Sequence, residues 1–538
     1  MKKLLLSLTL LCASLAYGQR DPKMDAFIDD LMSKMTLDEK LGQLNLASGG
    51  VPGVVGAAVG QDEAIRKGYL SATGGMDPAA TQKAQEIAVK ESRLGIPLLI
   101  GLDVIHGYKT VFPIPLAISC SWNPELIRKS ARIAAEEASA FGINWFYSPM
   151  VDIARDARWG RIAEGSGEDP WWGSEIAKAM VKGYQGDDLS APNTVMACVK
   201  HYALYGASEA GRDYNTVDMS RVAMYNYYLP PYKAAAEAGA GSFMSSFNVV
   251  DGIPATGNRW LLTDVLRDQW KFDGFVVSDA GSVGEMTAHG MGDLQQVAAL
   301  ALKAGLDMDM GANAFIWTLK KSLDEGKVTR QEIDQACRRI LEAKYKLGLF
   351  DNPYQYTDPE RQKKALSPEY LQTARELAGE SIVLLKNDRQ ILPLQKTGKI
   401  AVIGPMGNTR GELFGTWVML REEAPARSIF EAVKEVVGDR AEVVYAQGSN
   451  LTEEPMLLAQ TGKNTTPTET LIEQALETAK DADVIVATVG EPSGWSGEAR
   501  SRSDIGLPEC QKALLKALHD TGKPVVVAIM SGRPLTLS

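Results

Sequence analysis

Cysteine is scarce in this 538-residue sequence, and its spacing shows no pattern. Only five cysteines are present, and those beyond the N-terminus are Cys120, Cys198, Cys337 and Cys510. They lie too far apart for a metal-ligand cluster or a disulfide framework, so we expect buried free thiols. Cofactor motifs are also missing: there is no HExxH, no P-loop and no GxGxxG followed by an acid at the right distance. No metal, nucleotide or organic cofactor is implied.

Clustered basic charge is the second absence. The net charge is -10, and no long Lys/Arg run occurs. Because phosphate binding needs clustered positive charge, nucleic acid is not expected as a partner. A neutral substrate is compatible with this composition.

No apolar run is long enough to cross a bilayer, so we expect no membrane insertion. The N-terminal residues instead have the pattern of a signal peptide. Lys2 and Lys3 precede the apolar stretch 4–15, and small residues follow at Ala16 and Gly18. This order predicts a secretory signal peptide over residues 1–19 and a periplasmic mature protein.

Apolar runs alternate with helical periodicity through the first 350 residues. The runs cover 97–104, 143–151, 194–200, 241–248, 274–279 and 305–310. Helices are expected at 21–46, 124–141 and 221–238. The alternation predicts an α/β fold, a (β/α)8 TIM-like barrel over residues 20–350.

A second α/β unit is expected after a linker at 351–380 that begins with a stretch rich in Pro, Tyr and charge. Its strands are predicted at 399–404, 442–446, 483–490 and 523–530. Four strands without a closing repeat indicate an open sheet, an α/β sandwich domain over 381–538. No helix follows the last strand, so we expect this domain to be truncated at Ser538.

Several barrel strands end in polar groups that would converge on one mouth. They are Asp103 and His106, Asp152, Lys200 and His201, Asn248, and Asp279. Asp279 follows the uncharged run 275–278 directly. Taken alone, an aspartate at such a position is more often the N-cap of the next helix.

Eight sequence blocks, in order, resemble glycoside hydrolase family 3. They are GLDVIHG (101–107), ARWGRIAEGSGEDP (157–170), KHYALYG (200–206), GRDYN (211–215), SSFNVVDGIP (245–254), GFVVSDAGS (274–282), GEPSGWSGEARSRSDIGLP (490–508) and SGRPL (531–535). The resemblance spans about Met24 to Ser538. It implies a retaining mechanism with two carboxyl groups roughly 5–5.5 Å apart.

The resemblance also implies the catalytic residues. Asp279 matches the nucleophile, and Lys200 and Arg161 are expected to keep its pKa low. The acid/base comes from the second domain in this family, and Glu498 matches it best. Glu491 and Glu285 remain open alternatives.

The sugar-binding residues implied by the resemblance are Asp103, Arg161, Lys200, His201, Met244 and Ser246. Asp103 would accept hydrogen bonds from two hydroxyls, the three basic residues would donate, and Met244 and Ser246 would line the wall. Structural roles compete for some of them. Asp103 could be a strand-end cap, and Arg161 could pair with Glu164 or Glu168. Lys200 and His201 could belong to a structural network at the barrel floor.

Other polar and aromatic motifs are left outside the expected site. Arg212-Asp213 is interpreted as a structural ion pair. Trp171-Trp172 resembles a sugar-stacking pair, but packing is the more common role of tandem aromatics beside a proline.

One position departs from the family pattern. Many members have Trp directly after the nucleophile, whereas this sequence has Ala280. The change removes a stacking surface for the leaving group, which Trp495 could replace. We expect weaker selectivity on that side.

The sequence therefore predicts an exported exo-β-glycosidase that releases terminal β-D-glucosyl residues from oligosaccharides. Alternatives are a β-xylosidase or α-L-arabinofuranosidase on the same scaffold, and a non-catalytic periplasmic sugar-binding protein. The oligomeric state stays open.

Overall fold

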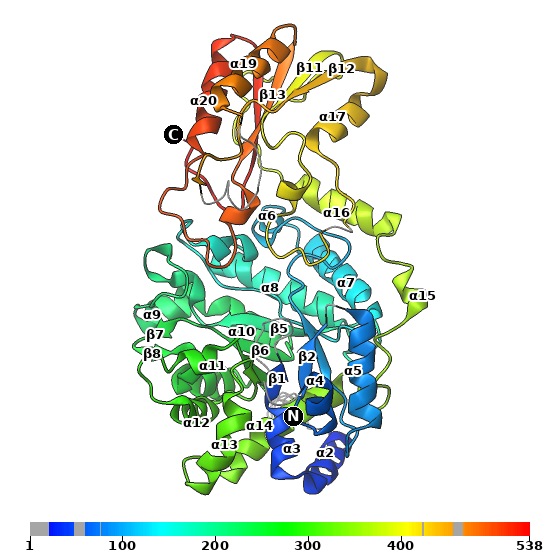
Figure 1. Ribbon diagram of the computed structural model, residues 1–538, viewed down its shortest axis with the longest axis vertical. Coiled ribbons are helices and arrows are strands. Elements are labelled where there is room, and N and C mark those ends of the chain that lie inside the picture. The colour runs from blue at the N-terminus through cyan, green and yellow to red at the C-terminus, as the bar shows by residue number, and fades with distance from the viewer. Residues whose placement is uncertain (1–20, 48–59, 76, 422–423, 456–465, 538) are drawn as a thin grey trace, which may run out of the picture.

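The computed structural model describes residues 21–47, 60–75, 77–421, 424–455 and 466–537. The signal peptide expected at 1–19 lies outside the described residues. Two units follow one another along the chain, a barrel and a smaller sheet domain stacked on one end of it (Figure 1). None of the helices in the described ranges is long and apolar enough to span a membrane.

Eight parallel strands form the barrel, in the order β10-β1-β2-β3-β4-β5-β6-β9. Their bounds are β1 Asn45–Ala47, β2 Ala72–Gly74, β3 Leu99–Leu102, β4 Trp145–Phe146, β5 Met196–Tyr202, β6 Ser242–Ser245, β9 Phe275–Ser278 and β10 Asp309–Met310. The ring closes beside β9, where Val277 bridges to Met308 and the Ser278 N–H donates to the Met308 carbonyl at 2.9 Å. The predicted barrel is confirmed.

Helices surround the barrel. They are α2 Pro22–Lys34, α3 Leu37–Gln43, α4 Gln61–Arg66, α5 Pro78–Lys90, α6 Pro115–Ser119, α7 Pro124–Ala140, α8 Pro170–Gln185, α9 Arg221–Ala223, η4 Met224–Tyr228, α10 Pro230–Glu237, η6 Trp260–Gln269, α11 Ser282–Glu285, α12 Leu294–Ala304, α13 Ala314–Asp324 and α14 Arg330–Lys346. Local sequence explains many starts. Asp169 caps α8 by accepting from the Trp172 N–H, and Pro170 occupies the first turn, where no backbone donor is needed.

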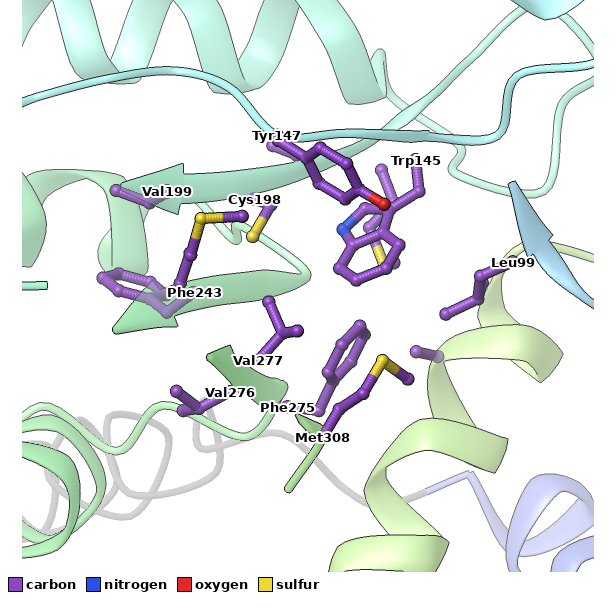
Figure 2. Close-up of a cluster of buried hydrophobic side chains, with 14 of the residues drawn as sticks. Leu99, Trp145, Tyr147, Cys198, Val199, Phe243, Phe275, Val276, Val277 and Met308 are labelled. Atoms are coloured by element: carbon purple, nitrogen blue, oxygen red, sulfur yellow. The ribbon is translucent and has the colours of Figure 1, made fainter. Parts of the chain in front are cut away.

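Large side chains fill the barrel interior (Figure 2). Trp145 and Phe275 are fully buried there, and the Trp145 indole N–H donates to Ser242 Oγ at 2.8 Å. Because the interior is packed, a ligand can enter only at the mouth of the barrel.

Two barrel strands escaped prediction. The helix expected at 21–46 ends at Gln43, and Asn45–Ala47 is β1. β2 was not anticipated either. Each has three residues, too few for a recognisable run or alternation.

The expected linker contains more structure than its composition indicated. It includes α15 Pro359–Gln362 and α16 Pro368–Ser381. α16 packs against α6 and α7 through the buried side chains of Tyr370 and Leu377. The second half of the segment is therefore part of the barrel's outer layer, and the domain boundaries stay predictions.

The second domain is an open parallel sheet in the order β12-β11-β13-β14. The strands are β11 Gly398–Ile403, β12 Ala441–Ala446, β13 Val484–Gly490 and β14 Val525–Met530; the helices are η7 Gly411–Phe414, α17 Ile429–Val437, η8 Gly438–Arg440, α19 Thr468–Ala479, η9 Ser493–Trp495 and α20 Glu509–Asp520. Alternate residues of β11 face opposite layers. Ala401 and Ile403 pack under α19 and α20, while Ile400 and Val402 pack toward α17.

Candidate active site

A pocket of about 430 Å³ opens at the barrel mouth, beneath the second domain. Its lining residues are Asp103, Tyr147, Arg161, Lys200, His201, Tyr214, Met244, Phe247, Asp279, Ala280, Glu285, Met310, Trp417 and Glu498. Seven of the eight residues predicted for the site therefore lie together. Ser246 is the exception, because it is buried and donates to the Ala203 carbonyl at 3.2 Å. Its expected place in the pocket wall is wrong.

Asp279 follows β9 and points into this pocket. Its Oδ1 accepts from the Ala280 N–H at 2.7 Å, and Oδ2 lies 3.6 Å from His201 Nε2. The next helix begins at Ser282 with Gly281 as N-cap and has no side-chain cap. Asp279 is therefore not the helix cap that its position in the sequence also allowed.

The pKa of Asp279 differs from expectation. Burial raises it to about 7, and the negative charge of Glu498 acts in the same direction. Arg161 and Lys200 do lower it, as expected, but they do not offset the lost hydration of the carboxylate. The prediction of a low pKa is wrong for this reason.

His201 belongs to a buried hydrogen-bond network. Its backbone N–H and ring Nδ1 both lie 2.9 Å from Asp152 Oδ2, and the Tyr232 hydroxyl donates to Asp152 Oδ1 at 2.5 Å. Burial, with Arg161 and Lys200 nearby, holds the His201 pKa well below its usual range. The imidazole is neutral, donates from Nδ1 to Asp152, and presents Nε2 to the pocket as an acceptor. The resemblance had implied a donor.

Two cationic residues beside Asp279 are held by carboxylate partners. Lys200 Nζ contacts Asp103 at 2.5 Å. Burial lowers the pKa of Lys200, but the negative charges of Asp103 and Glu164 outweigh this effect, so the pKa is raised overall. Arg161 forms a fork to Glu164 at 2.8 and 2.9 Å, and its other terminal nitrogen lies 3.6 Å from Glu498. Arg161 thus has both the structural partner and the pocket position that the sequence allowed.

The second domain supplies Glu498 to the pocket. Glu498 Oε1 accepts from the Tyr214 hydroxyl at 2.7 Å. Its neighbour Ala499 donates its N–H to Asp213 Oδ2 at 2.6 Å. Asp213 also accepts from the Trp159 indole at 2.9 Å. Asp213 thus fastens the loop of Glu498 to the barrel, whereas the described residues show no ion pair between Arg212 and Asp213.

The two alternatives to Glu498 lie in different surroundings. Glu491 is buried outside the pocket and pairs with Arg502 at 3.0 Å and Arg533 at 2.7 Å. Glu285 lines the pocket from the barrel side, where burial raises its pKa. Only Glu498 enters the pocket from the opposite domain to Asp279.

Sequence reasoning missed Trp417. It reaches the pocket from the second domain, with Lys200 Nζ 5.2 Å and Arg161 Cζ 5.9 Å from its ring. Trp495, expected to replace the missing tryptophan at Ala280, is buried under Arg502, which lies 3.8 Å from its ring. A lone tryptophan in a loop outside the matched blocks gave no local signal for Trp417. Tyr147, Tyr214, Phe247 and Met310 also line the pocket and were missed, although Tyr214 and Phe247 lie inside matched blocks.

Comparison with known proteins agrees with this geometry. The glycosyl hydrolase family 3 N-terminal domain matches residues 36–343, and the family 3 C-terminal domain matches residues 382–538. The chain belongs to glycosyl hydrolase family 3. It is therefore a glycoside hydrolase, as the sequence blocks predicted.

Two curated family 3 relatives align with most of the chain. The periplasmic beta-glucosidase of Salmonella typhimurium is 42% identical over 95% of this chain and 68% of its own length. A beta-xylosidase of Formosa agariphila is 37% identical over 86% of this chain and 66% of its own length. The chain thus spans about two thirds of the length of these relatives.

A solved family 3 structure has the same fold. The beta-glucosidase from Listeria innocua, determined with isofagomine, has a TM-score of 0.86 and 40% identity, covering 95% of this chain and 70% of that one. It was also determined with glucose, and a variant of it with laminaribiose.

Proposed function

We propose that this protein is a retaining exo-β-glucosidase that removes terminal β-D-glucosyl residues from oligosaccharides. The observation that carries the proposal is the pair of carboxyl groups, Asp279 and Glu498, that enter one pocket from opposite domains. The packed barrel closes the pocket below, which suits an enzyme that takes one chain end. The names of the Salmonella and Listeria relatives support glucose as the sugar.

The chemistry needs two carboxyl groups: Asp279 is the nucleophile, and Glu498 acts first as the acid and then as the base. Asp279 attacks the anomeric carbon while Glu498 transfers its proton to the departing oxygen, whose bond to that carbon breaks. Glu498 then takes a proton from water, whose oxygen attacks the same carbon and releases the Asp279 carboxylate. Sugar and aglycone leave with one water consumed, and no other reactant is needed.

The remaining pocket residues suit recognition of the glucosyl unit. Asp103 and Lys200 form a charged pair that can accept from and donate to neighbouring hydroxyls. Arg161 and Lys200 lower the pKa of Asp279 and so favour its ionised form. Met244 and Trp417 supply apolar surface to the sugar ring.

Export to the periplasm is part of the proposal. It rests on the signal peptide predicted at residues 1–19 and on the name of the Salmonella relative.

The first test is hydrolysis of p-nitrophenyl β-D-glucoside by the wild-type protein and by Asp279→Ala. We expect turnover of the glucoside and a loss of about 10³-fold or more in the variant. Ser246→Ala is the control, because that side chain is buried outside the pocket. If only a β-xyloside or an α-L-arabinofuranoside is cleaved, the proposed mechanism stands and the assignment of glucose as the sugar is wrong. If the protein binds glucose but cleaves none of these substrates, the proposed enzymatic function is wrong.

A second test separates the three glutamates. Glu498→Ala should lose about 10²- to 10⁴-fold on p-nitrophenyl β-D-glucoside. Added azide should restore turnover and yield β-glucosyl azide, because azide needs no general base. Glu285→Ala and Glu491→Gln should show no azide rescue. If azide instead rescues the Glu285 or the Glu491 variant, that residue is the acid/base.

A further inference from the structure

Three tryptophans stack on the outside of the barrel, away from the lining of the catalytic pocket. The ring centroids of Trp122 and Trp172 lie 4.8 Å apart with planes 18° from parallel, and those of Trp171 and Trp172 lie 6.2 Å apart at 29°. Trp172 is the buried middle member, and its indole donates to the Ser119 carbonyl at 2.9 Å. Trp122 and Trp171 are each 63% exposed. We call these three residues the tryptophan platform.

Packing among the described residues does not explain the exposure of two large rings. Trp172 alone satisfies the packing role expected of the tandem pair, since it is buried and hydrogen-bonded. Trp171 continues the stack into solvent, and Trp122 joins it from the loop after α6. The exposed indoles at either end of the stack offer apolar faces on which the C–H face of a sugar ring can lie.

A polar cleft of about 560 Å³ begins beside the platform. Asn123, the residue after Trp122, lines it, and the cleft continues between α7 and α8, which lie side by side below the second domain (Figure 1). Its exposed polar residues are Glu125, Arg128, Lys129, Lys182 and Asp187. Donors and acceptors thus stand next to aromatic faces.

The helices approach closely beneath this cleft. A Cβ at Gly183 of α8 would lie 2.6 Å from the Arg128 carbonyl oxygen and 2.6 Å from Ala131 Cβ of α7. Because Gly183 and Gly186 line the cleft and have no side chains, the cleft is deeper between the charged residues. The charges carry both signs, which suits neutral hydroxyl groups better than an ionic ligand.

We propose that the tryptophan platform and this cleft form a second carbohydrate-binding site, which holds a β-linked glucan chain. The ligand class rests on the proposed β-glucosidase function, but the binding does not require turnover. α6 links the two sites, because the Trp172 indole donates to the Ser119 carbonyl of α6 and α6 packs against η1 (Gly160–Glu164), the turn that carries Arg161. A polymer held there would stay near the enzyme while its ends are trimmed.

Affinity electrophoresis in gels that contain barley β-glucan tests the proposal. Excess glucose in the gel occupies the catalytic pocket, so any remaining retardation reports the second site. We expect the wild-type protein to be retarded, and Trp122→Ala/Trp171→Ala to lose affinity roughly tenfold because two stacking faces are removed. The variant should keep kcat/KM on p-nitrophenyl β-D-glucoside within about twofold, since neither ring lines the catalytic pocket.

Trp317→Ala is the matched control. Trp317 of α13 is 59% exposed but has no aromatic partner among the described residues. Equal loss of retardation in this control, or full retardation of the double variant, would overturn the proposal. A double variant that instead loses an oligomer in solution, with unchanged retardation, would assign the platform to a protein contact and also overturn it.

Lys182→Ala/Lys129→Ala tests the cleft without touching the tryptophans. Both side chains are exposed, so the fold should be retained. Retardation should weaken here too if the cleft contributes hydrogen bonds. If the wild-type protein is retarded by the glucan but does not hydrolyse p-nitrophenyl β-D-glucoside, the proposed function is overturned and this site still stands.

Discussion

At the scale of single residues, the protonation of Asp279 controls the first chemical step. Its pKa is raised to about 7 by burial, with Glu498 adding to the effect. Only the ionised carboxylate can attack the anomeric carbon. The free enzyme therefore loses its nucleophile as the pH falls through this value.

The pH profile of kcat/KM on p-nitrophenyl β-D-glucoside should show an acid limb with a midpoint of about 7. Because Asp279 and Glu498 are coupled, this midpoint belongs to the pair. Lys200→Met removes a charge that lowers the Asp279 pKa, so its limb should move to higher pH. A limb centred at about 4, the ordinary range of an aspartate, would contradict the account of burial.

Tyr214 is expected to be a positioning residue for Glu498. Its hydroxyl donates to Glu498 Oε1 at 2.7 Å, and it is held at a positive φ of 64° in the loop that follows Asp213. Removing the hydroxyl frees the carboxyl group to leave the orientation needed for proton transfer. Substrate affinity need not change.

We expect Tyr214→Phe to lower kcat/KM about 10-fold or more on substrates with poor leaving groups, which need the proton. A 2,4-dinitrophenyl glucoside, whose leaving group needs little protonation, should be affected far less. Tyr225→Phe removes a surface hydroxyl bonded to Gln269 at 2.8 Å and serves as control. Equal losses on both classes of substrate would indicate a merely structural role for Tyr214.

At the scale of elements, the loop carrying Glu498 packs directly on the barrel turn η1. The Gly497 N–H donates to the Gly160 carbonyl at 2.8 Å, and the Arg502 N–H donates to the Arg158 carbonyl at 3.0 Å. A Cβ at Gly160 would lie 2.3 Å from the Gly497 oxygen and 2.6 Å from the Arg500 oxygen. Only glycine allows the two backbones to approach this closely.

Gly160→Ala should therefore push the Glu498 loop away from the pocket. We expect kcat/KM to fall at least about tenfold, because a misplacement of about 1 Å is costly to a positioned catalytic group. Kinetics on p-nitrophenyl β-D-glucoside and a thermal melt measure the effect. Gly411→Ala, in the second domain with open space around it, should behave as wild type. Unchanged activity in Gly160→Ala would show that the contact does not position the loop.

At the scale of the whole molecule, Arg533 joins the two domains. It is buried, pairs with Glu491, and donates to the backbone carbonyls of Ala157 and Arg158 in the barrel and of Trp495 and Arg500 in the second domain. Glu491, a candidate acid from sequence, thus balances the charge of this bridge.

The stability of the whole fold depends on pH partly through Lys344, at the end of the barrel opposite the pocket. Burial lowers its pKa from 10.5 to about 7, and its Nζ donates to Gln43 Oε1 at 2.8 Å. The unfolded chain therefore binds more protons between about pH 7 and 10.5, so this group makes stability rise with pH over that window. Below about pH 7 the full cost of the buried charge is present.

Lys344→Met removes the charge and keeps a similar volume. We expect the variant to unfold at a higher temperature than wild type near neutral pH, with a gain in the free energy of unfolding of about 1–3 kcal/mol. The gain should shrink as the pH approaches 10.5. Lys346→Met, an exposed position of the same helix, should change little. A destabilised Lys344→Met protein would mean that the bond to Gln43 outweighs the buried charge.

The sequence by itself determined the barrel, the second sheet and the place of Asp279. Run length, alternation and strand-end polarity are local properties, and they indicated six barrel strands and all four strands of the second sheet. β1 and β2 escaped because three residues carry too little pattern. Ordered blocks along the chain, from Gly101 to Leu535, pointed to the family.

Tertiary structure alone decided the rest. Which glutamate reaches Asp279 depends on how the domains stack, and this separates Glu498 from the buried Glu491. Trp417 enters the pocket for the same reason, whereas Ser246 lies outside it because it is buried within the barrel against Ala203. The pKa of Asp279 was misjudged because the nearby charges were visible in the sequence, whereas the burial that outweighs them exists only once the chain has folded.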